Sequence, residues 1–197
     1  MAQSNSVSDV AKSLPHSKRT TEPYELLHFS QYRKEKKVDG YLIKRDAIES
    51  MQGLAKTHFL NHKAQRTNKS LGDLTGLTGF GFHLIEVPPG ALSTECHVHQ
   101  FEDEAVFVLE GSATARIGDE QFQIGEGDFV GYRANGEPHT IENTGDTPLK
   151  CIVVGQRLAH DVSDYPDLGK RLFRNQGQPW SMVDIDGIEH PKAGRKV

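Results

Sequence analysis

Three histidines and one carboxylate carry most of the chemistry that this 197-residue sequence could perform. His97 and His99 are separated by a single residue, Glu104 follows them closely, and His139 comes later, directly after a proline. Residues two apart on a strand point to the same face, so the first two imidazoles would project together, and Glu104 on the next strand could face them. This grouping is the outline of a metal site.

Three neutral imidazoles and a carboxylate suit one divalent transition metal, such as iron, manganese, nickel or zinc. When the ion prefers six ligands, this set leaves positions open for water or for a substrate. A metal with an open position can polarise a bound oxygen or lower the pKa of a water molecule. The residue types therefore indicate catalysis, but they choose neither the metal nor the reaction.

The elements that must hold these residues are short β-strands. Between residues 79 and 156, runs of strand length alternate with turn residues such as Pro-Pro-Gly and Gly-Asp, a pattern typical of an all-β sandwich or barrel. The predicted strands span residues 80–87, 93–99, 104–109, 113–117, 121–124, 128–132, 139–143 and 149–154. Eight short strands of this kind predict a jelly-roll barrel.

The spacing of these residues resembles the two sequence motifs of the cupin superfamily. Its first motif is a glycine, a spacer, two histidines one residue apart, a glutamate and a second glycine, matched here by Gly90, His97, His99, Glu104 and Gly111. The second motif begins with a glycine and ends in a histidine and an asparagine, matched by Gly127, His139 and Asn143. The resemblance covers residues 79–156. It implies a cupin-type jelly-roll β-barrel in which His97, His99, Glu104 and His139 are the metal ligands.

The sequence departs from the family pattern in two places. The spacer between Gly90 and His97 is one residue longer than usual. In the second motif the usual Pro-Ala-Gly turn is replaced by Arg-Ala-Asn-Gly at 133–136, with one extra residue before Pro138. The stretch at 131–134 resembles uncharacterised bacterial single-domain cupins more than the well-studied enzymes. We expect the altered turn to be where this chain has its own specificity.

Other residues compete for a place in the site. Glu102 and Asp103 are rival carboxylates to Glu104, and Glu102 could share its face, but the spacing to Gly111 favours Glu104. Five further histidines are interpreted as solvent or packing residues, and only His83 lies on a strand that could line the barrel. They are His58, His62, His83, His160 and His190.

Tyr132 and Arg133 are candidate catalytic residues on the segment that leads to His139. One of the two must face inward, where arginine could bind a carboxylate or phosphate and tyrosine could donate a proton. The thiols of Cys96 and Cys151 are expected to be buried and inert. The apolar residues Phe80, Phe82, Leu84, Phe107 and Phe129 are most simply assigned to the core.

The barrel is flanked by segments of different composition. Residues 1–22 are polar and lack apolar periodicity, which predicts a flexible N-terminal arm. Residues 23–78 are expected to form an extension that packs on the barrel, with a short helix near 45–53 and a loop at 61–78. The barrel core itself is assigned to 79–156, and the Gly- and Pro-containing segment 157–197 is predicted to be an irregular C-terminal tail.

Charge and composition limit the partners. The net charge of −4 comes from interspersed acidic and basic residues, which argues against nucleic acid. Two cysteines are too few for a disulfide scaffold, and neither a signal peptide nor a membrane span is recognisable, so we expect a cytoplasmic protein with no membrane partner. Pairing through edge strands predicts a homodimer.

The sequence leaves two functions open. The first is a metal-dependent enzyme that acts on a small polar molecule, and we favour an oxidoreductase or an isomerase. Dioxygenase, sugar-phosphate isomerase-like and lyase chemistry all remain open. The second is a non-catalytic module whose barrel binds or senses a small ligand. No clear proton-transfer residue is readable from the sequence, which keeps the second alternative open.

Overall fold

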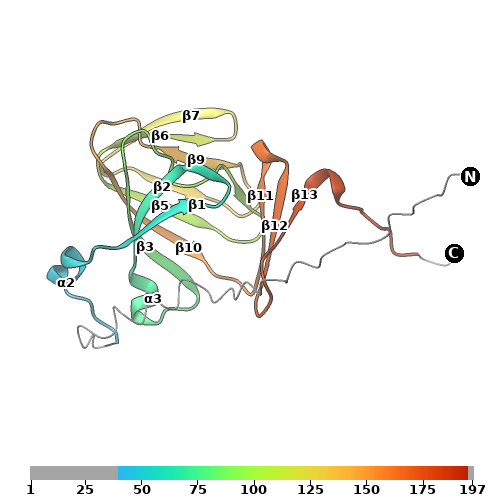
Figure 1. Ribbon diagram of the computed structural model, residues 1–197, viewed down its shortest axis with the longest axis horizontal. Coiled ribbons are helices and arrows are strands. Elements are labelled where there is room, and N and C mark those ends of the chain that lie inside the picture. Colours follow the sequence, from blue (N-terminus) through green and yellow to red (C-terminus); the bar gives the residue numbers. More distant parts are fainter. Residues whose placement is uncertain (1–39, 195–197) are drawn as a thin grey trace, which may run out of the picture. The chain divides into compact units, whose positions relative to one another are not determined.

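The computed structural model describes residues 40–194, so the predicted arm of residues 1–22 lies outside the described part. Within it the chain is built from strands with few helical turns (Figure 1). The strands are β1 (Leu54–His58), β2 (Asn61–Ser70), β3 (Phe80–Val87), β4 (Val98–His99), β5 (Glu104–Glu110), β6 (Ser112–Ile117), β7 (Glu120–Gly125), β8 (Phe129–Tyr132), β9 (His139–Glu142), β10 (Leu149–Gln156), β11 (His160–Tyr165), β12 (Lys170–Asn175) and β13 (Ser181–Asp184).

These strands form antiparallel sheets of six, three and four strands. The large sheet has the order β1-β2-β3-β10-β5-β8, and the small sheet has the order β7-β6-β9. The remaining sheet, β13-β12-β11-β4, brings β11 beside β4, and its strands β11 to β13 stand together at the right of Figure 1. The predicted all-β jelly roll is confirmed. The predicted strands are all present, although the run at 93–99 is reduced to β4.

The inner face of the large sheet is apolar towards one end. The register places Ile85, Cys151 and Val108 side by side across β3, β10 and β5, and all three are buried. Val87 and Leu149 form the next row and are fully buried. Ala113, Ala115, Ile124 and Ile141 of the small sheet belong to the same cluster. This end of the barrel is closed by a mainly apolar core, into which the buried Asn143 side chain donates a hydrogen bond to the Val87 carbonyl.

The same sheet is polar towards its other end. There the register aligns Gly81, Gly155, Glu104 and Tyr132 across β3, β10, β5 and β8. The two glycines carry no side chain, and a Cβ at Gly81 would lie 2.6 Å from His83 Nε2. The lack of bulk in this row leaves open space in front of Glu104.

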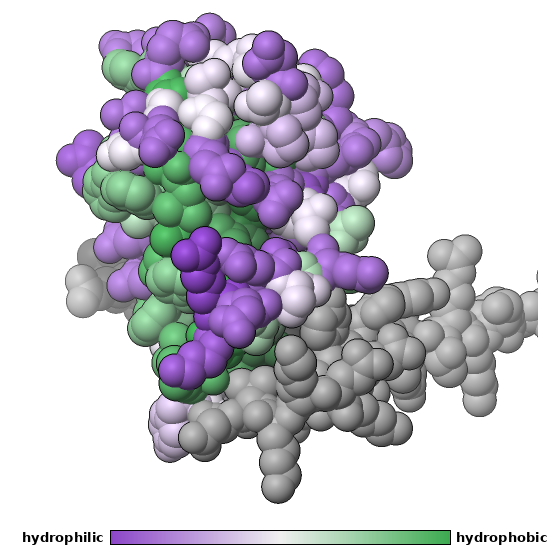
Figure 2. Space-filling view, turned by 90° about the vertical axis from the view of Figure 1, so that its left-hand side faces the viewer, coloured by the Kyte–Doolittle hydropathy of each residue, from purple (hydrophilic) through white to green (hydrophobic). Residues whose placement is uncertain are grey.

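Several aromatic residues expected in the core lie on the outer face instead. The register aligns Leu84, Ile152, Phe107 and Phe129 in one row across four strands, and Phe107 and Phe129 are 40% and 67% exposed. Phe80 is 40% exposed as well, so assigning it to the core was wrong. Both faces of β3 carry apolar residues, and alternation alone therefore could not tell inside from outside. Figure 2 shows apolar residues gathered in a continuous band on one side of the molecule.

Two flanking segments are more regular than the sequence suggested. The predicted loop at 61–78 contains β2 and the short helix α3 (Leu71–Thr75), and β2 pairs with β3 in the large sheet. The predicted irregular tail contains β11, β12 and β13. Both predictions failed because the inward positions of these strands are polar, as at Asn68 and Asp161, and such strands lack the usual apolar alternation.

Short helical turns complete the described part. The predicted helix near 45–53 is present as α2 (Arg45–Ser50), and the turns η1 (Pro166–Leu168) and η2 (Ile185–Gly187) flank the last strands. Between residues 40 and 194, none of the helices has the length and apolar character required to cross a bilayer.

Candidate metal centre

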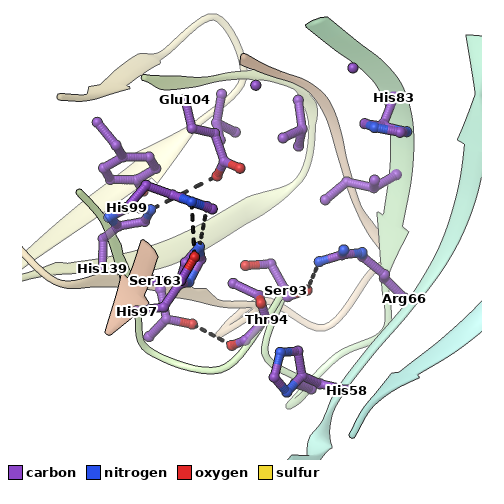
Figure 3. A pocket seen from close by; sticks show the side chains of 18 of the residues that line it. His58, Arg66, His83, Ser93, Thr94, His97, His99, Glu104, His139 and Ser163 are labelled. Carbon is purple, nitrogen blue, oxygen red and sulfur yellow. Dashed lines mark hydrogen bonds and ion pairs between the residues drawn. The ribbon is translucent and has the colours of Figure 1, made fainter. Parts of the chain in front are cut away.

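The four predicted ligands converge at the polar end of the barrel (Figure 3). The Nε2 atoms of His97 and His99 are 3.2 Å apart, and His139 Nε2 lies 3.9 Å from Glu104 Oε1. One ligand atom from each of His97, His99 and Glu104 lies within 4.8 Å of the others. His139, more than forty positions further along the chain than His97, is thus brought next to this group through Glu104.

Backbone pairing fixes the positions of all four side chains. His97 and His139 exchange two main-chain hydrogen bonds, of 3.1 and 2.9 Å, so both rings project from one bridge. His99 lies on β4 opposite Ser163 of β11. Glu104 begins β5, directly opposite Tyr132 of β8. The site is thus held by strands rather than by loops, which favours a fixed geometry.

Each histidine has an oxygen acceptor for its Nδ1 proton. His97 Nδ1 lies 2.9 Å from the Glu95 carbonyl, and His139 Nδ1 lies 3.2 Å from the Glu137 carbonyl. His99 Nδ1 lies 2.6 Å from Asp161 Oδ2. A proton on Nδ1 leaves the Nε2 lone pair free on every ring, which is the tautomer that a metal ligand requires.

These distances fit one first-row metal ion. Donor atoms that share an ion at about 2.1 Å lie about 3 to 4 Å apart, as the Nε2–Nε2 and Nε2–Oε1 distances do. His139 Nε2 is buried and has no hydrogen-bond partner among the described residues. A buried polar atom without a partner is costly, and a bound cation would satisfy it. The residues present therefore fit the ion that the sequence motifs imply.

Burial keeps two of the imidazoles neutral. His97 and His139 are 6% and 3% exposed. Loss of hydration, which disfavours the imidazolium form, lowers the pKa of His97 to about 3 and the pKa of His139 to about 4. At neutral pH both rings are unprotonated, which is the state that binds a metal.

His99 differs because a buried carboxylate supports it. Burial acts to lower the pKa of His99, but the hydrogen bond and the negative charge of Asp161 outweigh it, so the pKa is raised. Burial likewise acts to raise the pKa of Asp161, and the contact with His99 reverses the direction. Asp161 is 1% exposed, and Ser163 Oγ lies 3.1 Å from the same Nδ1. The sequence analysis missed both residues because they lie in the supposed tail.

Tyr132 and Arg133 point in opposite directions. The Tyr132 ring stacks on His139, with ring centroids 3.6 Å apart and planes 4° apart, and its buried hydroxyl has no partner among the described residues. Burial, together with the charge of Glu104, raises the pKa of Tyr132, so the phenol stays protonated. Arg133 is exposed and does not line the cavity, because adjacent residues of an extended chain face opposite ways. The predicted catalytic role of Arg133 is therefore not supported.

The rival carboxylates have other contacts. Glu102 is buried, accepts a hydrogen bond from the Leu158 amide and pairs with Arg174. Together with His99 and Asp161 it forms a second group of close donor atoms, behind the His99 ring. Asp103 accepts a 2.7 Å hydrogen bond from the Ala134 amide.

The altered turn at 133–136 contacts the site through its backbone. Asn135 has a positive φ of 54° and donates a 2.8 Å backbone hydrogen bond to the carbonyl of His99. Asparagine tolerates this left-handed conformation better than most residues. The departure from the family pattern thus lies against a candidate ligand.

A cavity of about 460 Å³ opens in front of the four candidate ligands. Two histidines interpreted as solvent or packing residues, His58 and His83, line it. Burial, and the positive charge of Arg157, lower the pKa of His83 to about 4, and its Nδ1 lies 2.9 Å from Ser70 Oγ. Arg66 of β2 also lines this space and was not foreseen.

The thiols agree with the sequence analysis. Cys96 and Cys151 are free and buried. Burial raises the pKa of Cys96 to about 11 and that of Cys151 to about 12, so neither is a reactive thiolate at neutral pH.

Comparison with known proteins agrees with the barrel and its motifs. Residues 83–155 match the family model of the cupin domain. The chain is 33% identical over 131 residues to the tetracenomycin polyketide synthase protein TcmJ of Streptomyces glaucescens, a match that spans 66% of this chain and 73% of that protein. The chain belongs to the cupin superfamily.

Two solved cupin-like structures are similar over most of their length. One, a proposed sugar phosphate isomerase of Acidithiobacillus ferrooxidans, has 47% identity and a TM-score of 0.74, and the match covers 77% of this chain and 97% of that one. The other, a sugar phosphate isomerase of Silicibacter pomeroyi, has 27% identity and a TM-score of 0.65, with 71% and 92% covered. The similarity extends well beyond the barrel motifs.

Proposed function

We propose that this cupin is a metal-dependent enzyme that acts on a small polar molecule and that its reaction is an isomerisation. The observation that carries the proposal is the group of close donor atoms from His97, His99 and Glu104, with His139 Nε2 3.9 Å from Glu104 Oε1, buried and otherwise unpartnered. His97, His99, Glu104 and His139 would hold one divalent ion, whether iron, manganese, nickel or zinc. When bound, such an ion polarises a ligand oxygen and makes an adjacent C–H more acidic.

The protein groups that line the cavity suit proton movement. Tyr132 keeps its phenol proton, and its unpartnered hydroxyl is available to donate a hydrogen bond to a ligand oxygen. His83 is neutral at physiological pH and can accept a proton. A protonated donor and a neutral acceptor lining one cavity are what the shift of a hydrogen between neighbouring carbons requires.

We favour isomerase chemistry over dioxygenase and lyase chemistry because of two similar structures. Two structures that match this chain over more than 90% of their own length carry sugar phosphate isomerase in their names. Dioxygenase and lyase chemistry need the same ligand set and remain the competing reactions.

The second candidate is a non-catalytic cupin that binds or senses a small ligand. The observation that favours it is the position of Tyr132, whose hydroxyl is buried and whose ring stacks flat on His139. A phenol fixed in this way can bind a ligand oxygen without moving a proton.

Turnover and binding can be separated by one experiment. The metal-reloaded protein is incubated with a panel of aldose phosphates, and ketose products are followed by NMR. Conversion that is lost in His97→Ala and lowered at least tenfold in Tyr132→Phe supports the isomerase. If no sugar phosphate is converted and oxygen uptake with catechols or keto acids is observed, the isomerase assignment is wrong. Ligand binding without turnover across both panels would favour the binding module.

We also propose that the protein forms a homodimer. The row of Leu84, Ile152, Phe107 and Phe129 leaves apolar surface on the outer face of the large sheet, and Figure 2 shows such a band. Exposed apolar patches of this kind favour association. Sedimentation should give twice the 21.9 kDa mass of the chain, and a monomeric mass would contradict the proposal.

A further inference from the structure

The cavity contains an arginine that the metal centre does not use. Arg66 lies on β2, whose inward residues also include Ala64 and Asn68, and Figure 3 shows its side chain across the cavity from Glu104 and the three histidines. Its side chain is partly buried, and its Nε is fully buried. A cation in this position is costly unless something compensates its charge.

No carboxylate among the described residues lies close enough to form an ion pair with it. The Nη1 atom donates a hydrogen bond to the Ser93 carbonyl, a neutral group, whereas Nε has no partner. By contrast Arg157, which lines the same cavity, pairs with Asp73. Loss of hydration lowers the pKa of Arg66, although the charge of Glu104 acts in the opposite direction.

One edge of the guanidinium has no hydrogen-bond partner among the described residues. The hydrogen bond of Nη1 to Ser93 anchors one corner, so Nε and Nη2 form the remaining edge. Two parallel N–H donors on this edge match two oxygens of a carboxylate or a phosphate, and such bidentate pairs are among the strongest polar contacts in proteins.

We propose that Arg66 is the anion-binding residue of this site and that the ligand is a small molecule carrying a carboxylate or phosphate group. This inference rests on the proposed function in one respect, since the rest of the ligand would approach the metal centre across the cavity. A divalent ion with one ligand carboxylate and three neutral imidazoles keeps a net charge of +1, and Arg66 adds another. A cavity with this excess of positive charge favours anions.

The test measures anion binding directly. Inorganic phosphate and, separately, acetate are titrated by calorimetry into the full chain at pH 8 in chloride-free buffer, both as purified and after removal of metal by a chelator. We expect Arg66→Met to weaken binding of the preferred anion about tenfold or more. Arg116→Met is the matched control, because it removes the same charge from a partly exposed arginine outside the cavity that pairs with Asp167, and its affinity should stay within twofold of wild type.

Arg66→Lys keeps the charge but loses the two parallel donors, and it should bind the anion severalfold more weakly than wild type. It also preserves the test if Arg66→Met does not fold. The preference between phosphate and acetate tells which anionic group the ligand carries. Equal affinity of wild type and the Arg66 variants, or no binding of either anion at millimolar concentration, overturns the inference. Because one titration uses metal-free protein, it tests anion binding by Arg66 even if the proposed metal centre turns out to bind no metal.

Discussion

The two ends of the barrel use the same strands for opposite purposes. Along β3 the inward residues change from Gly81 and His83 to Ile85 and Val87, and along β10 they change from Gly155 to Leu149. The apolar end is closely packed, whereas the polar end holds unpartnered donors and a cavity. Buried polar groups without partners lower stability, so the packed end must offset the cost of the site.

The largest effect is expected from a substitution in the packed, apolar end of the barrel. Leu149 is fully buried in the apolar cluster, and Leu149→Ala should lower the free energy of unfolding by about 2–5 kcal/mol, because lost burial and a cavity add together. Chemical denaturation measures the change. Metal affinity of the folded fraction should remain within twofold of wild type, and a parallel loss of metal binding would show that the two ends are not separable.

A smaller effect is expected behind the metal centre. Asp161→Asn keeps the shape of the side chain but removes the charge that supports His99, and it should weaken metal binding about 10–100-fold. The measurement is competition with a chromogenic chelator. Asp164→Asn is the matched control on the same strand, because Asp164 faces away from His99 and pairs with Arg171. Equal losses in the two variants would argue against a specific role for Asp161.

The next prediction concerns pH. The pKa of His83 is lowered from an ordinary value near 6.5 to about 4, so between these values the unfolded chain binds more protons and stability falls as pH falls. His83→Gln should reduce this pH dependence of the unfolding free energy. The upper limit of the reduction is about 1.4 kcal/mol per pH unit, the value for one proton, and the expected reduction is smaller because the ring is partly exposed. Unfolding titrations of the metal-free protein from pH 7 to 4 measure the slope. An unchanged slope would mean that this imidazole titrates normally.

The smallest effect tests Tyr132. Tyr132→Phe removes a buried hydroxyl without a partner and should leave the metal-free protein as stable as wild type or more stable, by about 1 kcal/mol at most. The melting temperature measures it, with Arg133→Ala as an exposed neighbour whose effect should be negligible. A clear loss of stability in Tyr132→Phe would reveal a hydrogen bond that the described contacts lack.

The two ends also differ in how far the sequence predicted them. Alternating apolar residues and turn signals located the strands from 80 to 156, because that pattern follows from burial of one sheet face. The spacing of His97, His99, Glu104 and His139 pointed to the site. Arg66 and Asp161 were missed, since a strand that lines a polar cavity has polar residues at its inward positions and looks like a loop. His83 was placed on a strand that could line the barrel but was interpreted as a solvent or packing residue.

On the outer face of the large sheet the sequence analysis made the opposite error, because it assigned exposed residues to the core. Phe107 and Phe129 are apolar and lie on strands, so sequence reasoning assigned them to the core, yet they are largely exposed. Only the pairing register across β5 and β8 decides which face they occupy.

The most direct test of the account is metal stoichiometry. Elemental analysis of protein purified without added metal should give about one first-row ion per chain, and His97→Ala and His139→Ala should each lower the retained metal at least tenfold, whereas His62→Ala, at an exposed histidine, should not. Thermal stability should rise on metal addition in wild type and in His62→Ala alone. Absence of stoichiometric metal, together with no response of the melting temperature to any added ion, would contradict the central claim that these residues form a metal centre.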